Sequence, residues 1–218
     1  ATLPVALAAA PALLTQNAAA EDAPAKATGA ATGPLPERQL GKSGRKVTML
    51  NMGGMMGALS VDYIDIAWSM GIRYFDTADC YKGGQSEKIF GQWFAKYPER
   101  RKEVFLVSKD HPKQGPEQLL TMIDKRLAAC GTDYLDAFFI HGIGPNEYGA
   151  DSLNWPKGGK FKEVAEALKK SGKVKLVGFS CHDGRLTDYL NAAAEGGFVD
   201  MIMLQSEPST LRSTRRAS

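Results

Sequence analysis

Short apolar runs alternate with amphipathic segments along most of the chain. The runs have the length of strands, and the segments between them carry apolar residues at helical spacing. The expected strands cover residues 48–52, 72–75, 104–107, 134–140, 174–179 and 201–204. The helices that we expect between them start near Ser60, Ser86, Pro116, Phe161 and Asp183. Strands that alternate with helices are typical of βαβ units, so the pattern predicts an α/β fold with parallel strands.

The two ends of the chain differ in composition from this central region. Residues 1–14 are apolar and uncharged, and an Ala/Gly/Pro linker follows up to Pro36. We interpret residues 1–36 as the remnant of an export signal followed by a disordered linker, which predicts a periplasmic protein. A disordered Ala-rich tail on a cytoplasmic protein is the alternative. Residues 206–218 lack apolar periodicity, and we interpret them as a non-native-looking or disordered tail.

The central region, residues 37–205, is short for the fold that its pattern predicts. A closed (β/α)8 barrel needs about 250 residues. We therefore predict a barrel truncated after about the sixth strand, preceded by a small β-hairpin that spans residues 38–47.

Charge and composition exclude several other classes of function. The net charge is only +3, and the Lys and Arg residues are dispersed, which gives no support for nucleic-acid binding. No segment after the linker has the long uncharged apolar run of a membrane span. The three cysteines are odd in number and lack metal-type spacing, so we expect neither a disulfide framework nor a metal site.

Candidate chemistry gathers where three successive strands end. Asp76 follows the second strand, Lys109 the third and His141 the fourth, and Tyr81 lies on the loop after Asp76. The carboxyl ends of parallel strands lie on one face, where the active sites of such folds form. We therefore expect these four side chains to meet in space.

These residues and their surroundings resemble the aldo-keto reductase family over about residues 38–205, and most closely its bacterial members with an export signal. The resemblance rests on the motifs FDTADCY at 75–81, VSK at 107–109, FIH at 139–141 and GFS at 178–180. It implies a (β/α)8 barrel that reduces a small carbonyl compound with NADPH or NADH. It also implies a catalytic tetrad of Asp76, Tyr81, Lys109 and His141. The cofactor-binding residues that it implies are Gly54, Met55, Ser180, Cys181 and Gln205.

The resemblance assigns a role to each member of the tetrad. Tyr81 would protonate the carbonyl oxygen as hydride arrives. An ammonium group of Lys109 about 4 Å from the phenol would lower its pKa from about 10 towards neutral. Asp76 would hold Lys109, and His141 would orient the carbonyl.

Two features depart from the family pattern and leave alternatives open. Cys181 stands where many members have Asn, and Ser206-Glu207 replaces an aromatic residue. The chain could instead be a catalytically silent binding or regulatory module, or a fragment without function.

Other polar residues near the predicted site have simpler interpretations. Trp155 is expected either to line a substrate pocket or to anchor a surface loop, and the remaining residues are expected to serve structural or solvated roles. These are Cys80 and Cys181 as small buried fillers, Asp79 and Asp110 as solvated loop residues, and His111 and His182, which have no metal-type spacing.

Overall fold

The computed structural model describes residues 34–57 and 59–204. The predictions made for residues 1–33, for Gln205 and for the tail lie outside the described residues. The remaining chain forms one compact unit of strands and helices.

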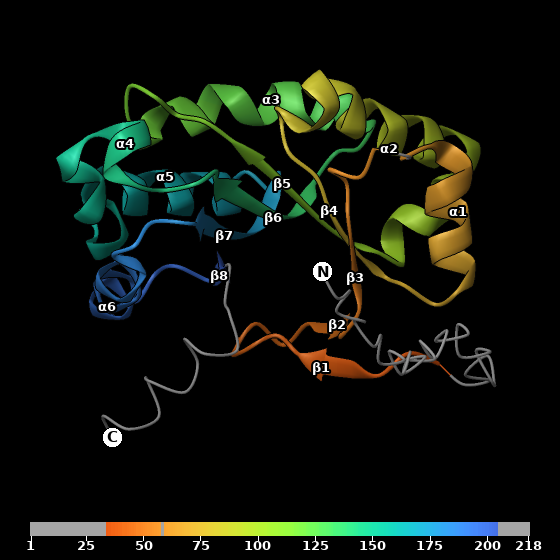
Figure 1. Cartoon of the computed structure of the whole chain (residues 1–218), viewed down its shortest axis with the longest axis horizontal. Helices are drawn as coiled ribbons and strands as arrows, with labels where there is room; N and C mark the ends of the chain where they lie inside the picture. Colours follow the sequence, from red (N-terminus) through yellow and green to blue (C-terminus); the bar gives the residue numbers. More distant parts are fainter. Residues whose placement is uncertain (1–33, 58, 205–218) are drawn as a thin grey trace, which may run out of the picture. The chain divides into compact units, whose positions relative to one another are not determined.

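A parallel sheet of six strands, curled into a partial barrel, forms the centre of the molecule (Figure 1). Its strands are β3 (Asn51–Gly53), β4 (Tyr74–Asp76), β5 (Phe105–Asp110), β6 (Leu135–Ile140), β7 (Val174–Cys181) and β8 (Met201–Leu204). They lie in sequence order, and each pairs with the next in parallel. This order confirms the predicted succession of βαβ units.

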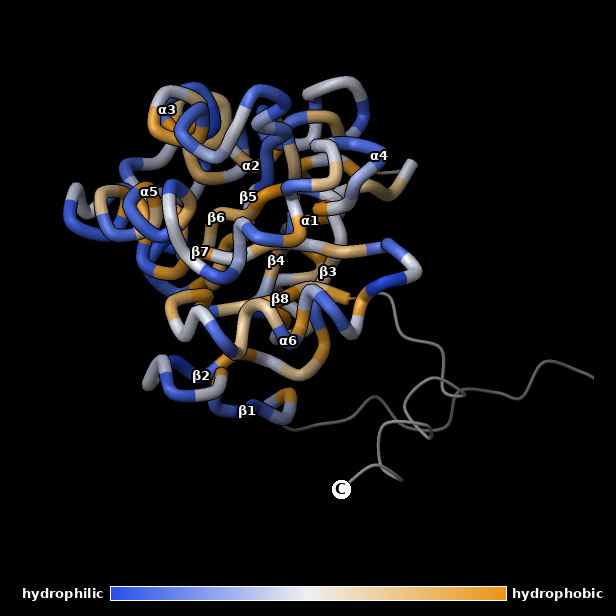
Figure 2. The backbone as a smooth tube through the Cα atoms, turned by 90° about the vertical axis from the view of Figure 1, so that its left-hand side faces the viewer, coloured by the Kyte–Doolittle hydropathy of each residue, from blue (hydrophilic) through white to orange (hydrophobic). Residues whose placement is uncertain are grey.

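Helices follow the strands along the outer side of the sheet (Figure 1). They are α1 (Val61–Ser69), α2 (Gln85–Lys96), α3 (Leu119–Cys130), α4 (Pro145–Tyr148), α5 (Gly159–Lys170) and α6 (Leu186–Gly196). Short 3₁₀ turns connect them: η1 (Tyr81–Gly84), η2 (Pro98–Lys102), η3 (Pro116–Gln118), η4 (Ala150–Leu153) and η5 (Trp155–Lys157). Hydrophobic and hydrophilic residues alternate along the helices, as amphipathic packing on a sheet requires (Figure 2).

Alternate residues of the strands build two separate cores. Phe75 and Leu106 point into the large cluster between the sheet and the helices. Tyr74, Phe105 and Val107 point to the inside of the curl, where they form a smaller cluster. This two-residue period is what a strand buried on both faces requires, because successive side chains leave a strand on opposite sides.

The predicted hairpin is present as the antiparallel strands β1 (Glu37–Gln39) and β2 (Lys46–Thr48). It lies on the inner side of the curl (Figure 1), where Val47 joins the smaller core cluster. An ion pair fixes it to the sheet, because Arg45 Nη2 lies 2.7 Å from the Asp136 carboxylate.

Several predicted boundaries differ from the structure, and three of them were wrong because of a specific contact. The first sheet strand begins at Asn51 rather than at residue 48, because Thr48 pairs with Glu37 in the hairpin. Ser86 lies inside α2 rather than capping it, and its hydroxyl lies 2.7 Å from that of Thr77. Asp183 does not cap α6, because it accepts from the backbone N–H of Arg185 before the helix begins at Leu186.

Other terminal signals were read correctly. Ser60 caps α1 by accepting a hydrogen bond from the backbone N–H of Tyr63. Gly131 ends α3 in the left-handed conformation, with φ +59°, as a residue without a Cβ does readily.

No helix among residues 34–57 and 59–204 combines the length and the apolar character that a bilayer-spanning helix needs.

Candidate active site

The ends of three neighbouring strands and one loop carry the four residues predicted to be catalytic. Asp76 is the last residue of β4, Lys109 is the penultimate residue of β5, and His141 directly follows β6. Tyr81 opens the turn η1 after β4. The parallel register brings these ends to the same edge of the sheet, so the sequence prediction of their location is confirmed.

The ammonium group of Lys109 is the centre of this cluster. Its Nζ atom lies 2.5 Å from Asp76 Oδ1, 3.0 Å from the carbonyl oxygen of Thr77 and 3.1 Å from the hydroxyl of Tyr81. The ring of His141 meets the ring of Tyr81 edge-on, with 5.6 Å between the ring centroids. Lys109 is fully buried, so all three of its N–H donors are directed by the protein rather than by water.

The pKa of Tyr81 differs from the value that the sequence predicts. Burial raises the pKa of the phenol, and the negative charge of Asp76 raises it further. The expectation that Lys109 brings this pKa towards neutral is therefore not met, because burial and the neighbouring negative charge outweigh the effect of the nearby ammonium group. The phenol is protonated at neutral pH, which is the form that can donate a proton.

Burial also shifts the pKa values of the other three groups. It raises the pKa of Asp76 and lowers the pKa of Lys109, while the attraction between the two opposes both shifts. It also lowers the pKa of His141, so this imidazole is neutral at pH 7. A neutral imidazole can donate one hydrogen bond to a carbonyl oxygen and accept another.

A second group of side chains lies against the tetrad and was not predicted. His111 Nδ1 lies 3.0 Å from the Asp79 carboxylate, and the rings of His111 and His141 are 4.5 Å apart. Burial opposes ionisation of Asp79, but the hydrogen bond from His111 and the neighbouring imidazole of His141 outweigh it and hold the pKa of Asp79 below its usual range. The prediction that Asp79 is a solvated loop residue was therefore wrong. Its position three residues after Asp76 on the same strand end was the available signal.

Asp110 is likewise buried rather than solvated. Its carboxylate lies 3.3 Å from Arg126 Nη1, and Arg126 Nε lies 3.4 Å from the buried Glu87. Ser108 donates to Glu87 at 2.6 Å. Burial raises the pKa of Glu87 to about 7, although Ser108 and Arg126 oppose this shift.

The described residues that are predicted to bind the cofactor lie in two places, at the end of β7 and just after β3. Ser180 and Cys181 end β7 beside His141, and both are buried. Gly54 donates its N–H to the carbonyl oxygen of Asp76 at 2.6 Å, and a side chain there would collide with Ser86. Met55 is 70% exposed at the end of β3.

The hydrogen bonding of the Ser180 side chain fits a nicotinamide cofactor. The hydroxyl oxygen of Ser180 accepts a hydrogen bond from the backbone N–H of Gly142 at 2.8 Å. Among the described residues, no acceptor faces the hydroxyl proton of Ser180. That proton is therefore available for an amide oxygen at the strand end next to His141. The thiol of Cys181 is a weaker donor than the amide of an Asn.

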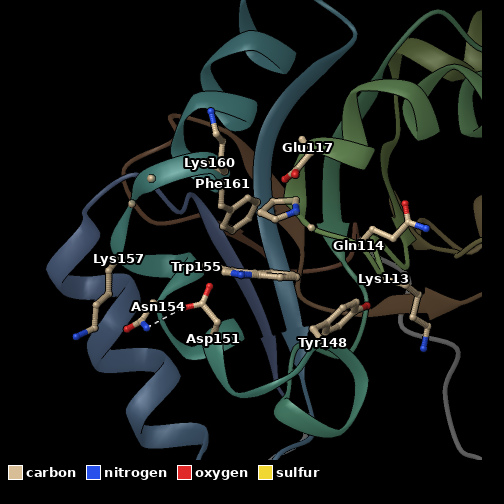
Figure 3. Close-up of a pocket in the computed structure, with 14 residues that line it drawn as sticks. Lys113, Gln114, Glu117, Tyr148, Asp151, Asn154, Trp155, Lys157, Lys160 and Phe161 are labelled. Carbon is tan, nitrogen blue, oxygen red and sulfur yellow. Dashed lines mark hydrogen bonds between the residues drawn. The ribbon is translucent and has the colours of Figure 1, made fainter.

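Two cavities lie near this edge of the sheet. The first, of about 350 Å³, is lined by His111, His141 and His182 and by the loop after β6. The second, of about 630 Å³, is lined by Tyr148, Trp155 and other residues of α5, η3 and that loop (Figure 3). Trp155 therefore does line a cavity, but none of the four tetrad residues shares it.

Comparison with known proteins identifies the family. A model of the aldo/keto reductase family matches residues 49–218, so the chain belongs to the aldo/keto reductase family. The chain is 27% identical over 199 residues to the uncharacterised oxidoreductase YrpG of Bacillus subtilis, covering 80% of this chain and 58% of YrpG. It is 29% identical over 128 residues to the NADP(+) aldo-keto reductase yakc of Schizosaccharomyces pombe, covering 52% of this chain and 34% of yakc.

A solved structure supports the fold. The aldo/keto reductase from Brucella melitensis superposes with a TM-score of 0.62 at 23% identity, covering 84% of this chain and 69% of that one. Among the curated relatives, the match to this chain covers little more than half the length of YrpG and about a third of the length of yakc.

Proposed function

We propose that this protein reduces an aldehyde or ketone to an alcohol, with Tyr81 as the general acid. The observation that carries the proposal is the position of the Lys109 ammonium group between Asp76 and the Tyr81 hydroxyl. Membership of an oxidoreductase family supports it. The name of the S. pombe relative supports NADPH as the cofactor.

When bound, the cofactor would supply a hydride to the carbonyl carbon. The protein would then have to provide a proton for the oxygen and to stabilise the charge that develops there. Tyr81 is protonated and lies beside His141, so a carbonyl oxygen between the two rings could accept from both. Ser180, Cys181, Gly54, Met55 and Gln205 are the residues that we propose to hold the cofactor.

Lys109 would act after the proton leaves Tyr81. The phenolate that remains is 3.1 Å from the ammonium group, so its charge is paired without movement of either side chain. Asp76 keeps Lys109 in this position. The high pKa of Tyr81 in the protein without substrate keeps the phenol protonated. The phenol then gives up its proton only when negative charge develops on the substrate oxygen.

The test compares Tyr81→Phe with Tyr63→Phe, a matched change on α1 that lies away from the site. Cofactor oxidation with a simple aldehyde is followed for each variant. Tyr81→Phe should lower kcat by about 10²–10⁴-fold, the usual range for loss of a general acid, and leave the cofactor dissociation constant unchanged. Tyr63→Phe should behave as the wild type. Equal measurable rates in all three proteins would exclude Tyr81 as the acid, whereas no cofactor oxidation above background in the wild type would favour a silent binding module.

A further inference from the structure

Four potential metal ligands converge beside the tetrad, and they come from three different strand ends. Asp79 and Cys80 lie on the loop after β4, His111 follows β5, and His141 follows β6. One ligand atom from each of the four lies within 4.8 Å of every other. We propose that these residues form a binding site for a late first-row divalent cation such as Zn²⁺.

Two of the three close distances between the ligand atoms fall in the range expected around a tetrahedral ion, and the third is slightly shorter. Ligands about 2.0–2.3 Å from a Zn²⁺ ion stand roughly 3.3–3.8 Å apart at tetrahedral angles. His141 Nδ1 lies 3.6 Å from Asp79 Oδ1 and 3.7 Å from Cys80 Sγ, and His111 Nδ1 lies 3.1 Å from Asp79 Oδ1. The side chains would need only small movements to surround one ion.

The contacts of His141 suit a shared metal ion as well as the hydrogen bond that its Nδ1 atom makes with Cys80 Sγ. Its Nδ1 atom faces both a carboxylate and a thiol, yet it is too far from the carboxylate for a good hydrogen bond. A single nitrogen that faces a carboxylate and a thiol at this spacing is suited to share a cation with them, and the thiol would release its proton when the ion binds. Two imidazoles, one carboxylate and one thiolate form a donor set that binds Zn²⁺ and Co²⁺ more tightly than Mg²⁺ or Ca²⁺.

An ion can reach the cluster from solvent. The cavity of about 350 Å³ opens on both His111 and His141, and the Cys80 side chain is exposed. Binding would tie the ends of β4, β5 and β6 together, and we therefore expect Zn²⁺ to raise the melting temperature.

The experiment titrates Co²⁺ into the metal-free protein, because tetrahedral Co²⁺ absorbs visible light and its thiolate bond adds a near-ultraviolet band. The wild type should show both absorptions with one equivalent bound. Cys80→Ser should lose the thiolate band, and His111→Ala should bind at least about tenfold more weakly. His182→Ala removes an exposed histidine outside the cluster, and Cys181→Ser removes a different thiol, so both should keep the wild-type spectrum.

A wild-type spectrum without tetrahedral bands would overturn the proposal, as would a thiolate band that survives in Cys80→Ser. If a variant is poorly folded, the effect of Zn²⁺ on the wild-type melting temperature remains a second test, and no rise would count against the site. Bound Zn²⁺ should also slow carbonyl reduction, because the ion would coordinate His141. This expected effect on the rate rests on the proposed function. Cobalt binding without any reductase activity would therefore reject the reductase and leave the metal site standing.

Discussion

The buried pair of Lys109 and Asp76 makes a quantitative prediction about the variant Lys109→Met. At 2.5 Å and an effective dielectric constant of about 20, the attraction between the two charges is about 7 kcal/mol. The cost of removing both ions from water is of similar size, so the pair itself adds little net stability. Removing only the lysine leaves the buried carboxylate unpaired, which should lower the free energy of unfolding by about 3–5 kcal/mol.

The double variant Asp76→Asn/Lys109→Met separates this electrostatic penalty from loss of packing. It removes both charges, so it should be more stable than Lys109→Met alone, with a coupling free energy of about 2–3 kcal/mol. Urea denaturation at pH 7.5, followed by circular dichroism, measures all four corners of the cycle. Both variants should lack reductase activity, because neither retains the ammonium group beside Tyr81.

The pH dependence of the single variant adds a check on the sign. Burial raises the pKa of Asp76 in the folded protein, and loss of Lys109 removes the group that opposes this shift. The folded state then binds a proton that the unfolded state releases, so the stability of Lys109→Met should fall as the pH rises above about 4. Single effects that simply add, within about 0.5 kcal/mol, would refute the claim that the two side chains form one buried pair.

Three further predictions concern residues around the tetrad. Burial raises the pKa of Glu87 to about 7 from an ordinary 4.5, so the native protein should lose stability as the pH rises through this window; Glu87→Gln should flatten the dependence in thermal melts, and an unchanged slope would contradict the assignment. Tyr148 donates its hydroxyl to the carbonyl oxygen of His141 at 2.5 Å, so Tyr148→Phe should lower kcat several-fold while cofactor binding stays constant; a change in cofactor affinity alone would argue against this positioning role. Arg101→Met leaves Asp136 without its 3.0 Å partner in the core and should cost about 3–5 kcal/mol by urea denaturation, whereas a loss below about 1 kcal/mol would show that Arg45 suffices.

The order of strands could be predicted because each apolar run is short and each helix has a clear apolar face. The same pattern located the tetrad, since Asp76, Lys109 and His141 each stand at the end of a run. These predictions need only the rule that parallel strands end at one edge of the sheet.

The sequence could not predict properties that depend on packing between distant segments. Thr48 reads as part of an apolar run, but its pairing with Glu37 places it in the hairpin. The environment of Asp79 depends on His111, which lies 32 positions away and reaches it only in the folded sheet. The pKa of Tyr81 depends on how deeply its ring is buried, which spacing alone does not specify.

The most direct test of the central claim follows the transferred hydrogen itself. The protein is incubated with an aldehyde and NADPH that carries deuterium at the reactive carbon of the nicotinamide, and the alcohol is analysed by mass spectrometry. If the cluster around Tyr81 supports hydride transfer, the alcohol should carry one deuterium on its carbinol carbon, and Tyr81→Phe should form little of it. Absence of deuterated alcohol with the wild type, under conditions in which the cofactor binds, would contradict the account.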